Sequence, residues 1–222
     1  KTINNLHKLK KNIKKIEIIF IDDFSTDDTL NILNQSSKKK LYVKFFKNKK
    51  KGLGSAIEIG IKKSRYQFIT IFMCDSSDSI MDLIKYYKIM SQNKYDAVLG
   101  SRFLKKSKIK NYPLFKLVLN RLFNNFVKFI FFSDYNDFTN AFKIYKKDVL
   151  RDLLPIVSEN FNVFLEIPLK IISRQYIYKI IPINWKNRKI GRSNFRIKEL
   201  SSMYIFTLFY CMIEKILLNK KK

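Results

Sequence analysis

Short apolar, β-branched segments alternate with helical segments through the first half of the chain, and this alternation constrains the fold most. The predicted strands are residues 16–21, 41–46, 68–73 and 96–100. Between them, residues 56–63 and 81–90 repeat apolar side chains at helical spacing. We therefore expect an α/β fold with a mostly parallel sheet flanked by helices. The continuous hydrophobicity of the strands fits a sheet that is covered on both faces.

The chain is strongly basic, with 45 Lys and Arg against 18 Asp and Glu in 222 residues and a formal net charge of +27. This excess suggests a polyanionic partner, such as nucleic acid, an anionic membrane surface or a phosphorylated substrate. A coding bias toward Lys, Asn, Ile and Phe would give the same charge without a partner. The lysines are scattered and no nucleic-acid-binding motif is visible, so we expect no nucleic-acid partner.

Cysteine and histidine are too scarce for several kinds of site. Cys74 and Cys211 lie far apart and outside any CxxC spacing, so we expect neither a disulfide framework nor a zinc site. A reducing compartment is the default for such a chain. His7 is the one histidine and lies in a lysine-rich opening segment, which leaves Ser–His–Asp catalysis and histidine-rich metal sites little to build on.

Two segments of the second half are unusually apolar. In residues 114–132 the polar side chains form one narrow stripe along a helix; they are Lys116, Asn120, Arg121, Asn124, Asn125 and Lys128. Such a helix is either fully packed or lies in a membrane interface. Residues 203–213 form an apolar run that is too short to span a bilayer, and we expect an interfacial helix there, with an ordinary core helix as the alternative.

Acidic residues follow two of the predicted strands. Asp22 and Asp23 come after the first strand, and Asp75 comes after the third. In open α/β sheets, ligands bind beyond the carboxyl ends of the strands, and carboxylates there are costly unless a ligand pairs with them. One such carboxylate suits Mg²⁺ or Mn²⁺, which fills its other positions with water and substrate phosphates. A helix cap at Asp78 or Ser79 is the competing interpretation of the segment after Asp75.

Gly52 and Gly54 precede a predicted helix in the stretch KKGLGSAIEIG. They suggest a phosphate-cradling loop, although neither the GxGxxG nor the GxxxxGK[ST] pattern is present. A simple turn with close helix packing explains them as well.

Taken in order, six stretches resemble glycosyltransferase family 2 with the GT-A fold; they are IDDFSTDDT, GLGSAIEIG, MCDSSD, YDAVLGSRF, NDFTNAFKIY and INWKNRKIGRSN. Their order and spacing hold from about Lys15 to Asn194. The most similar subgroup is the dolichyl-phosphate mannose synthase type, which loads sugars onto polyprenyl phosphates. The resemblance implies an inverting, metal-dependent enzyme that uses a UDP- or GDP-sugar and a polyprenyl or dolichyl phosphate at the cytoplasmic face of a membrane.

The resemblance also implies roles for particular residues. The nucleotide-sugar site would comprise Asp22, Asp23, Ser25, Gly52, Gly54 and Asp75, with Asp75 as the ligand of Mg²⁺ or Mn²⁺. The acceptor phosphate would be held by Arg102, Arg121, Arg188 and Ser193. Asp75, Arg102 and Asp137 would form the catalytic set, with Asp137 positioning a neighbour. For Arg102 and Arg188 the structural alternative is a surface charge or an ion pair with Asp137 or Glu166. A lipid phosphate is already charged at neutral pH and needs no general base.

The chain departs from the family pattern at several positions. Met73 stands where the family has the first acid of its DxD motif, and Phe24 stands where it has a glycine. The family begins with a strand that we do not find ahead of residue 15.

We expect residues 1–195 to form the GT-A domain and residues 196–222 a membrane-associated helix with a basic tail. Alternatives are transfer to a glycan with Asp78 or Asp137 as base, a non-catalytic relative, or a basic nucleic-acid-binding module.

Overall fold

The computed structural model describes residues 2–75, 77–187 and 197–219. In chain order the elements are α1 (Thr2–His7), η1 (Lys8–Lys11), β1 (Ile18–Asp22), α2 (Thr29–Lys39), β2 (Val43–Lys47), α3 (Leu53–Lys63), β3 (Phe68–Thr70), α4 (Ile80–Met90), β4 (Ala97–Ser101), β5 (Lys108–Lys110), α5 (Leu114–Phe131), β6 (Lys143–Lys146), α6 (Lys147–Asp152), α7 (Val163–Ser173), β7 (Tyr178–Pro182), β8 (Asn184–Lys186) and α8 (Ile197–Asn219). Strands and helices alternate through the first half, and the predicted α/β class is confirmed.

The strands form separate sheets. β1 and β2 pair in parallel, β3, β6, β4 and β7 form a four-stranded sheet in that order, and β5 pairs with β8. β4 and β7 are parallel, whereas β6 runs antiparallel to both of its neighbours. The expected parallel pairing therefore holds for β1–β2, β4–β7 and β5–β8, and the four-stranded sheet is mixed. The prediction from alternation missed β6 because this strand returns from α5 and the loop after it.

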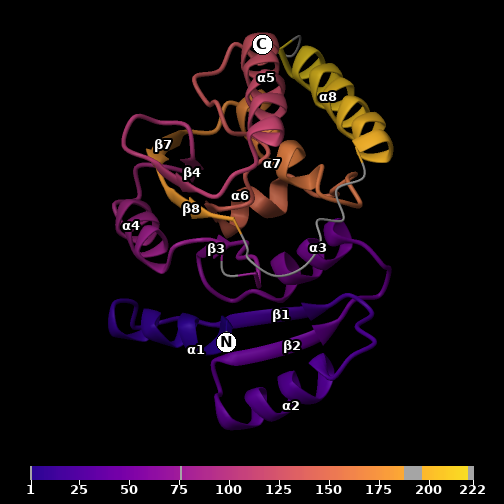
Figure 1. Ribbon diagram of the computed structural model, residues 1–222. Coiled ribbons are helices and arrows are strands. Elements are labelled where there is room, and N and C mark those ends of the chain that lie inside the picture. The colour runs from indigo at the N-terminus through magenta and orange to yellow at the C-terminus, as the bar shows by residue number, and fades with distance from the viewer. Residues whose placement is uncertain (1, 76, 188–196, 220–222) are drawn as a thin grey trace.

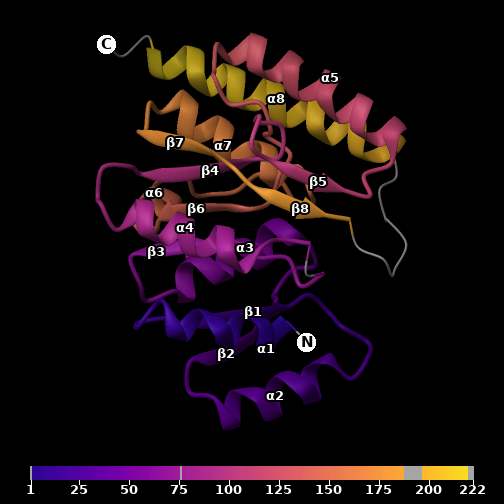
Figure 2. The same ribbon diagram turned by 60° about the vertical axis from the view of Figure 1, so that its left-hand side comes forward.

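The elements are stacked along the long direction of the molecule (Figures 1 and 2). The β1–β2 pair lies at one end with α1 and α2, and the four-stranded sheet lies above it. α3 and α4 lie at the level between the two sheets, and α5 and α8 lie side by side at the opposite end. α7 lies between this helix pair and the four-stranded sheet.

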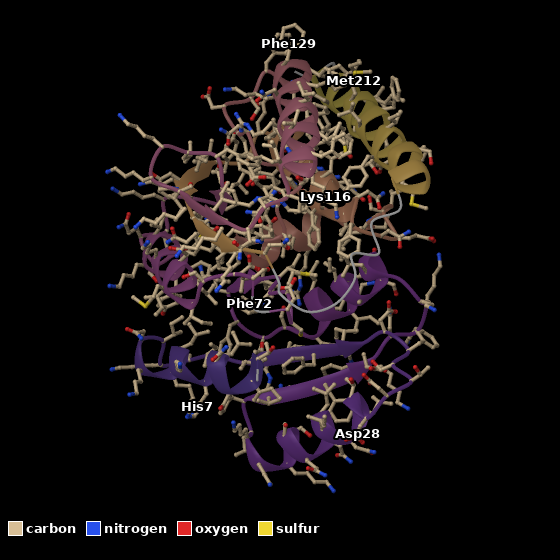
Figure 3. All side chains as sticks on the ribbon, in the orientation of Figure 1. His7, Asp28, Phe72, Lys116, Phe129 and Met212 are labelled. Carbon is tan, nitrogen blue, oxygen red and sulfur yellow. The ribbon has the colours of Figure 1, made fainter. Side chains whose placement is uncertain are left out.

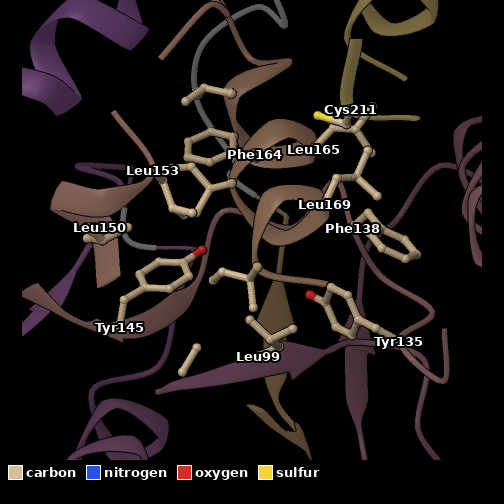
Figure 4. Close-up of a cluster of buried hydrophobic side chains, with 14 of the residues drawn as sticks. Leu99, Tyr135, Phe138, Tyr145, Leu150, Leu153, Phe164, Leu165, Leu169 and Cys211 are labelled. Atoms are coloured by element: carbon tan, nitrogen blue, oxygen red, sulfur yellow. The ribbon is translucent and has the colours of Figure 1, made fainter. Parts of the chain in front are cut away.

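α7 forms the centre of the larger core. Its side chains pack against the sheet and against α8, as Leu99, Leu165 and Cys211 show in Figure 4. A buried ion pair crosses its surface, with Lys170 Nζ 2.7 Å from Glu166 Oε1. The Glu166 carboxylate accepts hydrogen bonds from the N–H groups of Val157 and Ser158, so this pair fastens the loop before α7. Both charges are compensated, as burial demands.

α5 differs from an ordinary surface helix, because polar side chains face the protein and large apolar side chains face the surface. Part of its polar stripe faces the protein: Asn124 is fully buried, and Asn120 Nδ2 donates to Thr139 Oγ1 at 2.8 Å. Its large apolar side chains are exposed; they are Leu114, Phe115, Val118, Leu119, Leu122, Phe126 and Phe129, which we call the outer face of α5. Figure 3 shows Phe129 projecting at the free end of the helix.

α8 adds further exposed apolar side chains beside α5; they are Ile205, Phe206, Phe209, Ile213, Ile216 and Leu217. Among the described residues, no helix combines the length and the apolar composition needed to cross a bilayer.

Candidate active site

The carboxyl end of β1 presents two carboxylates with different surroundings. Asp22 is 6% exposed; its Oδ2 accepts a hydrogen bond from the Ser25 N–H at 3.4 Å, and its Oδ1 is buried without a partner in the described part of the chain. Asp23 instead accepts hydrogen bonds from Asn48 Nδ2 at 2.8 Å and the Gly52 N–H at 2.9 Å. Asp23 therefore fastens the turn before α3, whereas Asp22 keeps an oxygen that a ligand could satisfy.

Phe24 follows these acids with a φ of 62°, in the left-handed region. A glycine would adopt this conformation without strain, so Phe24 occupies a backbone position that favours glycine. The Phe24 ring is exposed beside the carboxylates.

Gly52 and Gly54 are explained by close packing of a distant loop. A Cβ on Gly54 would lie 1.8 Å from the carbonyl oxygen of Ser158, and one on Gly52 would lie 2.9 Å from that of Glu159. The Gly54 N–H donates to the Glu159 carbonyl at 3.1 Å, and Gly52 has a φ of 136°. The glycines thus allow the loop before α7 to approach α3. Their contact with a nucleotide stays a prediction.

A small pocket joins the end of β1 to the segment after β3. It has a volume of about 250 Å³, and its lining includes Asp22, Asp23, Ser25, Thr2 and Cys74. We call it the β1-end pocket. Asp75 follows Cys74 directly and is exposed. The fold thus brings the predicted nucleotide-sugar residues of β1 close to the predicted metal ligand.

The segment after β3 supplies two carboxylates. Asp75 Oδ1 accepts a hydrogen bond from the Ser77 N–H at 3.0 Å. Asp78 Oδ2 is buried without a partner in the described part of the chain. Burial, and then the negative charge of Asp75, raise the pKa of Asp78 to about 7. The cap of α4 is Ser79, whose Oγ accepts from the Asp82 N–H, so Asp78 is free of that role.

These carboxylates fit a small divalent cation. Mg²⁺ and Mn²⁺ accept carboxylate oxygens, and Mg²⁺ commonly takes only one or two of them from the protein. The unpaired oxygen of Asp78 beside the charge of Asp75 is the observation that supports the fit. No group of three or more His, Cys, Asp or Glu side chains with metal-binding geometry occurs among the described residues. The fit is therefore to a cation held largely by a ligand and water.

A second polar cluster forms where β4 ends. Arg102 Nη2 donates to Asp137 Oδ1 at 2.7 Å, and Arg102 Nε donates to Asp137 Oδ2 at 2.9 Å. Burial opposes the charge on Arg102, but the Asp137 carboxylate more than offsets it, and the pKa of Arg102 is raised. Aromatic rings surround this guanidinium at 5.3 to 5.7 Å; they belong to Phe103, Tyr112 and Trp185. Asp137 therefore positions Arg102, which is the structural alternative that the sequence left open.

Arg121 reaches the same cluster from α5. Its guanidinium carbon lies 4.5 Å from the centre of the Phe103 ring, on which Arg102 also packs. Arg121 Nη1 is buried and has no hydrogen-bond partner in the described part of the chain. An unpaired guanidinium N–H is a suitable donor to a phosphate. Arg188 and Ser193, the other predicted acceptor residues, lie outside the described residues.

Trp185 and Asp78 connect the two clusters. The Trp185 backbone forms a bridge with Asp78, and its ring lies 5.6 Å from the Arg102 guanidinium. The acidic strand end and the arginine cluster are thus parts of one site. The sequence did not indicate the aromatic rings around Arg102, although Trp185 stands in the quoted stretch INWKNRKIGRSN. Tyr112 stands outside every quoted stretch and gave no signal.

Comparison with known proteins agrees with the geometry. Residues 1–154 match the family model described as glycosyl transferase family 2. The polyprenol monophosphomannose synthase of Mycolicibacterium smegmatis is 22% identical over 187 residues, which cover 81% of this chain and 70% of that protein. An uncharacterised protein of Methanocaldococcus jannaschii is 29% identical over 163 residues, covering 67% of this chain and 69% of that protein.

Solved structures show the same fold. Glucosyl-3-phosphoglycerate synthase from Mycobacterium tuberculosis, in complex with Mn²⁺, UDP-glucose and phosphoglyceric acid, superimposes with a TM-score of 0.63 at 15% identity, covering 94% of this chain and 75% of that one. A mycobacterial protein superimposes with a TM-score of 0.65 at 15% identity and covers 88% of this chain. This chain spans 64% of that structure, less than two thirds of its length.

The predicted α/β architecture of the GT-A type is confirmed by these structures. The family match extends over more than half of the residues, and the chain therefore belongs to glycosyltransferase family 2 and is a glycosyltransferase.

Proposed function

We propose that this glycosyltransferase moves a sugar from a nucleotide-sugar donor to a polyprenyl phosphate at a membrane surface. The donor would bind between the β1-end pocket and Asp75, and the acceptor phosphate would bind at Arg121. Transfer would take place between these two parts of the site.

Support for the donor side comes from the carboxylates at the strand ends. Asp22 Oδ1 is buried without a partner in the described part of the chain and can accept a hydrogen bond from a sugar or base N–H or O–H. The Mycobacterium tuberculosis synthase was solved with UDP-glucose and Mn²⁺, which favours a UDP-sugar and a divalent cation here. Asp75 and Asp78 would hold the Mn²⁺ or Mg²⁺. When bound, such a cation stabilises the negative charge that develops on a leaving diphosphate.

Support for the acceptor side comes from the arginine cluster. Arg121 keeps a buried N–H unpaired, and Asp137 orients Arg102 beside it. The second pKa of a monophosphate ester is near 6, so the acceptor oxygen is largely deprotonated at neutral pH and no side chain has to remove a proton. The relative from Mycolicibacterium smegmatis, named as a polyprenol monophosphomannose synthase, supports a polyprenyl phosphate in this place.

The exposed apolar outer face of α5 is the observation that supports membrane binding. Asn120 and Asn124 of the polar stripe of α5 donate to Thr139 Oγ1, which also accepts from Arg102 Nη2 at 3.5 Å. The outer face of α5 exposes apolar side chains. Seven large apolar side chains exposed on one helix of a highly charged protein indicate an interaction surface. A bilayer would cover the outer face of α5, and the net charge of +27 would add attraction to anionic headgroups. We place this surface on the cytoplasmic side, in line with the reducing compartment expected from the cysteines.

Incubation of the protein with Mn²⁺, vesicles containing a polyprenyl phosphate, and labelled UDP- or GDP-sugars tests the proposal. We expect label to enter the lipid phase. Asp75→Asn should abolish transfer, whereas Asp134→Asn, which changes an exposed carboxylate outside both clusters, should leave it unchanged. Arg121→Gln should raise the KM for the lipid about tenfold with the donor KM unaffected, against Arg151→Gln as an exposed control.

Parallel arms separate the other acceptors. Phosphoglyceric acid, which the Mycobacterium tuberculosis synthase binds, and a soluble glycan are offered in place of the lipid. Label in either product and none in the lipid would overturn the lipid assignment. Absence of transfer to every acceptor, together with a salt-dependent shift of DNA, would favour the basic binding module instead.

A further inference from the structure

Lys143 is a buried charged residue to which the proposed function gives no role. It begins β6, its side chain is fully buried, and its backbone pairs with Leu99 of β4. Lys170 is likewise buried, but its amine forms an ion pair with Glu166. The amine of Lys143 contacts backbone carbonyl oxygens instead and forms no ion pair in the described part of the chain. A buried amine without a contacting carboxylate is costly for folding, so its position calls for a specific role.

Burial lowers the pKa of Lys143 to about 7, although the negative charge of Asp137 opposes this shift. The nearby guanidinium of Arg102 lowers the pKa further, whereas the charge of Asp78 raises it. The amine therefore lies within the electrostatic field of the candidate active site, although the proposed transfer makes no use of it.

The amine of Lys143 donates hydrogen bonds to three backbone carbonyl oxygens. Nζ donates to the Phe138 carbonyl at 3.0 Å, to the Asn140 carbonyl, and to the Phe164 carbonyl of α7 at 3.4 Å. An ammonium group has three N–H donors, so three acceptors match its capacity. Figure 4 shows Phe138 and Phe164 in the same core. Lys143 thus joins the loop before β6 to α7.

A proline explains why the Phe164 carbonyl needs a donor from outside α7. In a helix this carbonyl would accept the N–H of the residue four positions later, which is Pro168 and has no N–H. Phe164 and Pro168 are both buried, and a buried carbonyl needs a partner. Lys143 of β6 supplies that partner.

The loop that contacts Lys143 also orients Arg102. Asp137 accepts hydrogen bonds from Arg102 through both carboxylate oxygens, and Thr139 Oγ1 accepts one from Arg102 Nη2 at 3.5 Å. The two carbonyls of this loop that accept from Lys143 belong to the residues directly after these two. In residues 137–140, side chains directed to Arg102 therefore alternate with carbonyl groups directed to Lys143.

We propose that Lys143 is a positioning residue for Arg102. It holds residues 137–140 in the conformation in which this loop orients the guanidinium. Without the amine, buried carbonyl groups would lose their donor, and the loop would rearrange to recover hydrogen bonds. Arg102 would then lose its fixed orientation. The effect on sugar transfer rests on the proposed function, because it requires that the arginine cluster bind the acceptor phosphate.

Trp185 allows a test that does not depend on activity. It is the only tryptophan of the chain, and its ring centre lies 5.6 Å from the Arg102 guanidinium carbon. The quenching of its fluorescence by acrylamide therefore reports on the surroundings of Arg102. Lys143→Met removes the amine and keeps the length of the side chain. Lys170→Met is the matched control, because it removes a similarly buried amine whose carbonyl partners lie outside the arginine cluster.

We expect Lys143→Met to raise the acrylamide quenching constant of Trp185 at least about twofold, because a loosened loop opens the cluster more often. Lys170→Met should lower Tm and leave this constant as in the wild type. A wild-type constant in folded Lys143→Met would overturn the inference, and so would an equal rise in both variants. If Lys143→Met does not fold by circular dichroism, Lys143→Gln, which keeps two N–H donors, is measured against the same two criteria.

Transfer of sugar to the polyprenyl phosphate gives a second measurement. We expect Lys143→Met to raise the KM for the lipid about tenfold and to leave the donor KM unchanged, with Lys143→Gln between this variant and the wild type. If the wild type uses the lipid and Lys143→Met uses it with the same KM and kcat, Lys143 does not position Arg102 for the reaction. If the wild type does not use the lipid while the quenching of Trp185 still rises in Lys143→Met, the proposed function fails and the positioning of Arg102 stands.

Discussion

The ionised form of Asp78 is unfavourable in the folded protein, because the side chain is buried and lies near the negative charge of Asp75. Asp78 Oδ2 is buried without a hydrogen-bond partner in the described part of the chain. Its folded pKa of about 7 lies above the ordinary 3.8, so the folded state binds this proton more tightly than the unfolded state. The resulting stability is complete below about pH 4 and is lost as the pH rises toward 7 and through it.

For the metal-free protein, we expect Asp78→Asn to remove the loss of stability that accompanies ionisation of Asp78 as the pH rises. The free energy of unfolding at pH 8 should rise by up to about 4 kcal/mol, since three pH units at about 1.36 kcal/mol each are involved. Urea unfolding in EDTA between pH 4 and pH 8 measures the difference. Asp134→Asn serves as control, and a variant as pH-dependent as the wild type would show that Asp78 is not the destabilising group.

Gly54 and Gly60 offer a matched pair within α3. A Cβ at Gly54 would overlap the Ser158 carbonyl at 1.8 Å, whereas one at Gly60 would meet only Ile21 Cγ1 at 4.0 Å. We expect Gly54→Ala to lower Tm by about 4–8 °C through overpacking of about 2 kcal/mol. Gly60→Ala should raise Tm slightly, because alanine is the better helix residue by about 0.5–1 kcal/mol. Thermal unfolding measures both, and a loss as large at Gly60 would exclude the close loop as the cause.

At the scale of elements, α5 links the site to the surface. The same helix directs Arg121 and Asn124 inward to the arginine cluster and exposes its apolar residues. A polar inner face is tolerated because the Asn120–Thr139–Asn124 hydrogen bonds satisfy it. The outer face of α5 and Arg121, which we assign to the acceptor phosphate, therefore belong to the same helix, so a membrane bound to this face would lie close to the acceptor site.

The outer face of α5 can be tested with a triple substitution. Leu122, Phe126 and Phe129 are 62%, 53% and 75% exposed, so their replacement by glutamine should leave the fold intact. We expect Leu122→Gln, Phe126→Gln and Phe129→Gln together to reduce binding to vesicles of phosphatidylglycerol and phosphatidylcholine at least about tenfold. Vesicle flotation is the measurement.

The control is Leu41→Gln, because Leu41 is 94% exposed in the turn between α2 and β2, at the other end of the molecule. It should float like the wild type. Unchanged flotation of the triple variant would show that α5 is not the membrane contact.

At the scale of the whole molecule, local pattern predicted local structure well. β1, β2 and β4 lie within one or two residues of their predicted bounds, and α4 begins one residue earlier than expected. β3 ends at Thr70 rather than at residue 73, where the predicted strand continued. β3 pairs with β6 only from Phe68 to Thr70, opposite Lys146 to Ile144, and the apolar pattern of one strand does not reveal where its partner strand begins.

Long-range contacts decided what the sequence left open. The sequence left Arg102 with several alternatives, among them a phosphate contact, a surface charge and an ion pair with Asp137 or Glu166. Nothing local fixes a contact between residues 35 positions apart, such as Arg102 and Asp137. The residues around Gly54 in the sequence suggest a phosphate loop or a turn. The structure shows that a glycine is needed there because the Ser158 carbonyl oxygen, about a hundred residues later, lies too close for a Cβ. The unpaired N–H of Arg121 likewise depends on how α5 is oriented, which the narrow polar stripe allowed but did not determine.

α8 tests whether the chain divides at residue 195, as we expected from the sequence. Leu208 and Cys211 are buried in the core around α7, and Thr207 Oγ1 accepts a hydrogen bond from Asn162 Nδ2 at 2.9 Å. Arg174 Nε also donates to Glu214 Oε1 at 2.7 Å. Removal of residues 196–222 would uncover one side of α7, whose residues are almost all buried.

We expect the chain of residues 1–195 to lose cooperative thermal unfolding and to bind a hydrophobic dye, because uncovered core surface is not compensated by any new contact. Deletion of residues 220–222 alone should keep Tm within about 1 °C, as expected for a change at a chain end. Calorimetry and dye fluorescence measure both variants. If residues 1–195 unfold cooperatively at the Tm of the full chain, the division at residue 195 is correct and α8 is an appendage; otherwise α8 belongs to the catalytic domain and carries the apolar surface as part of it.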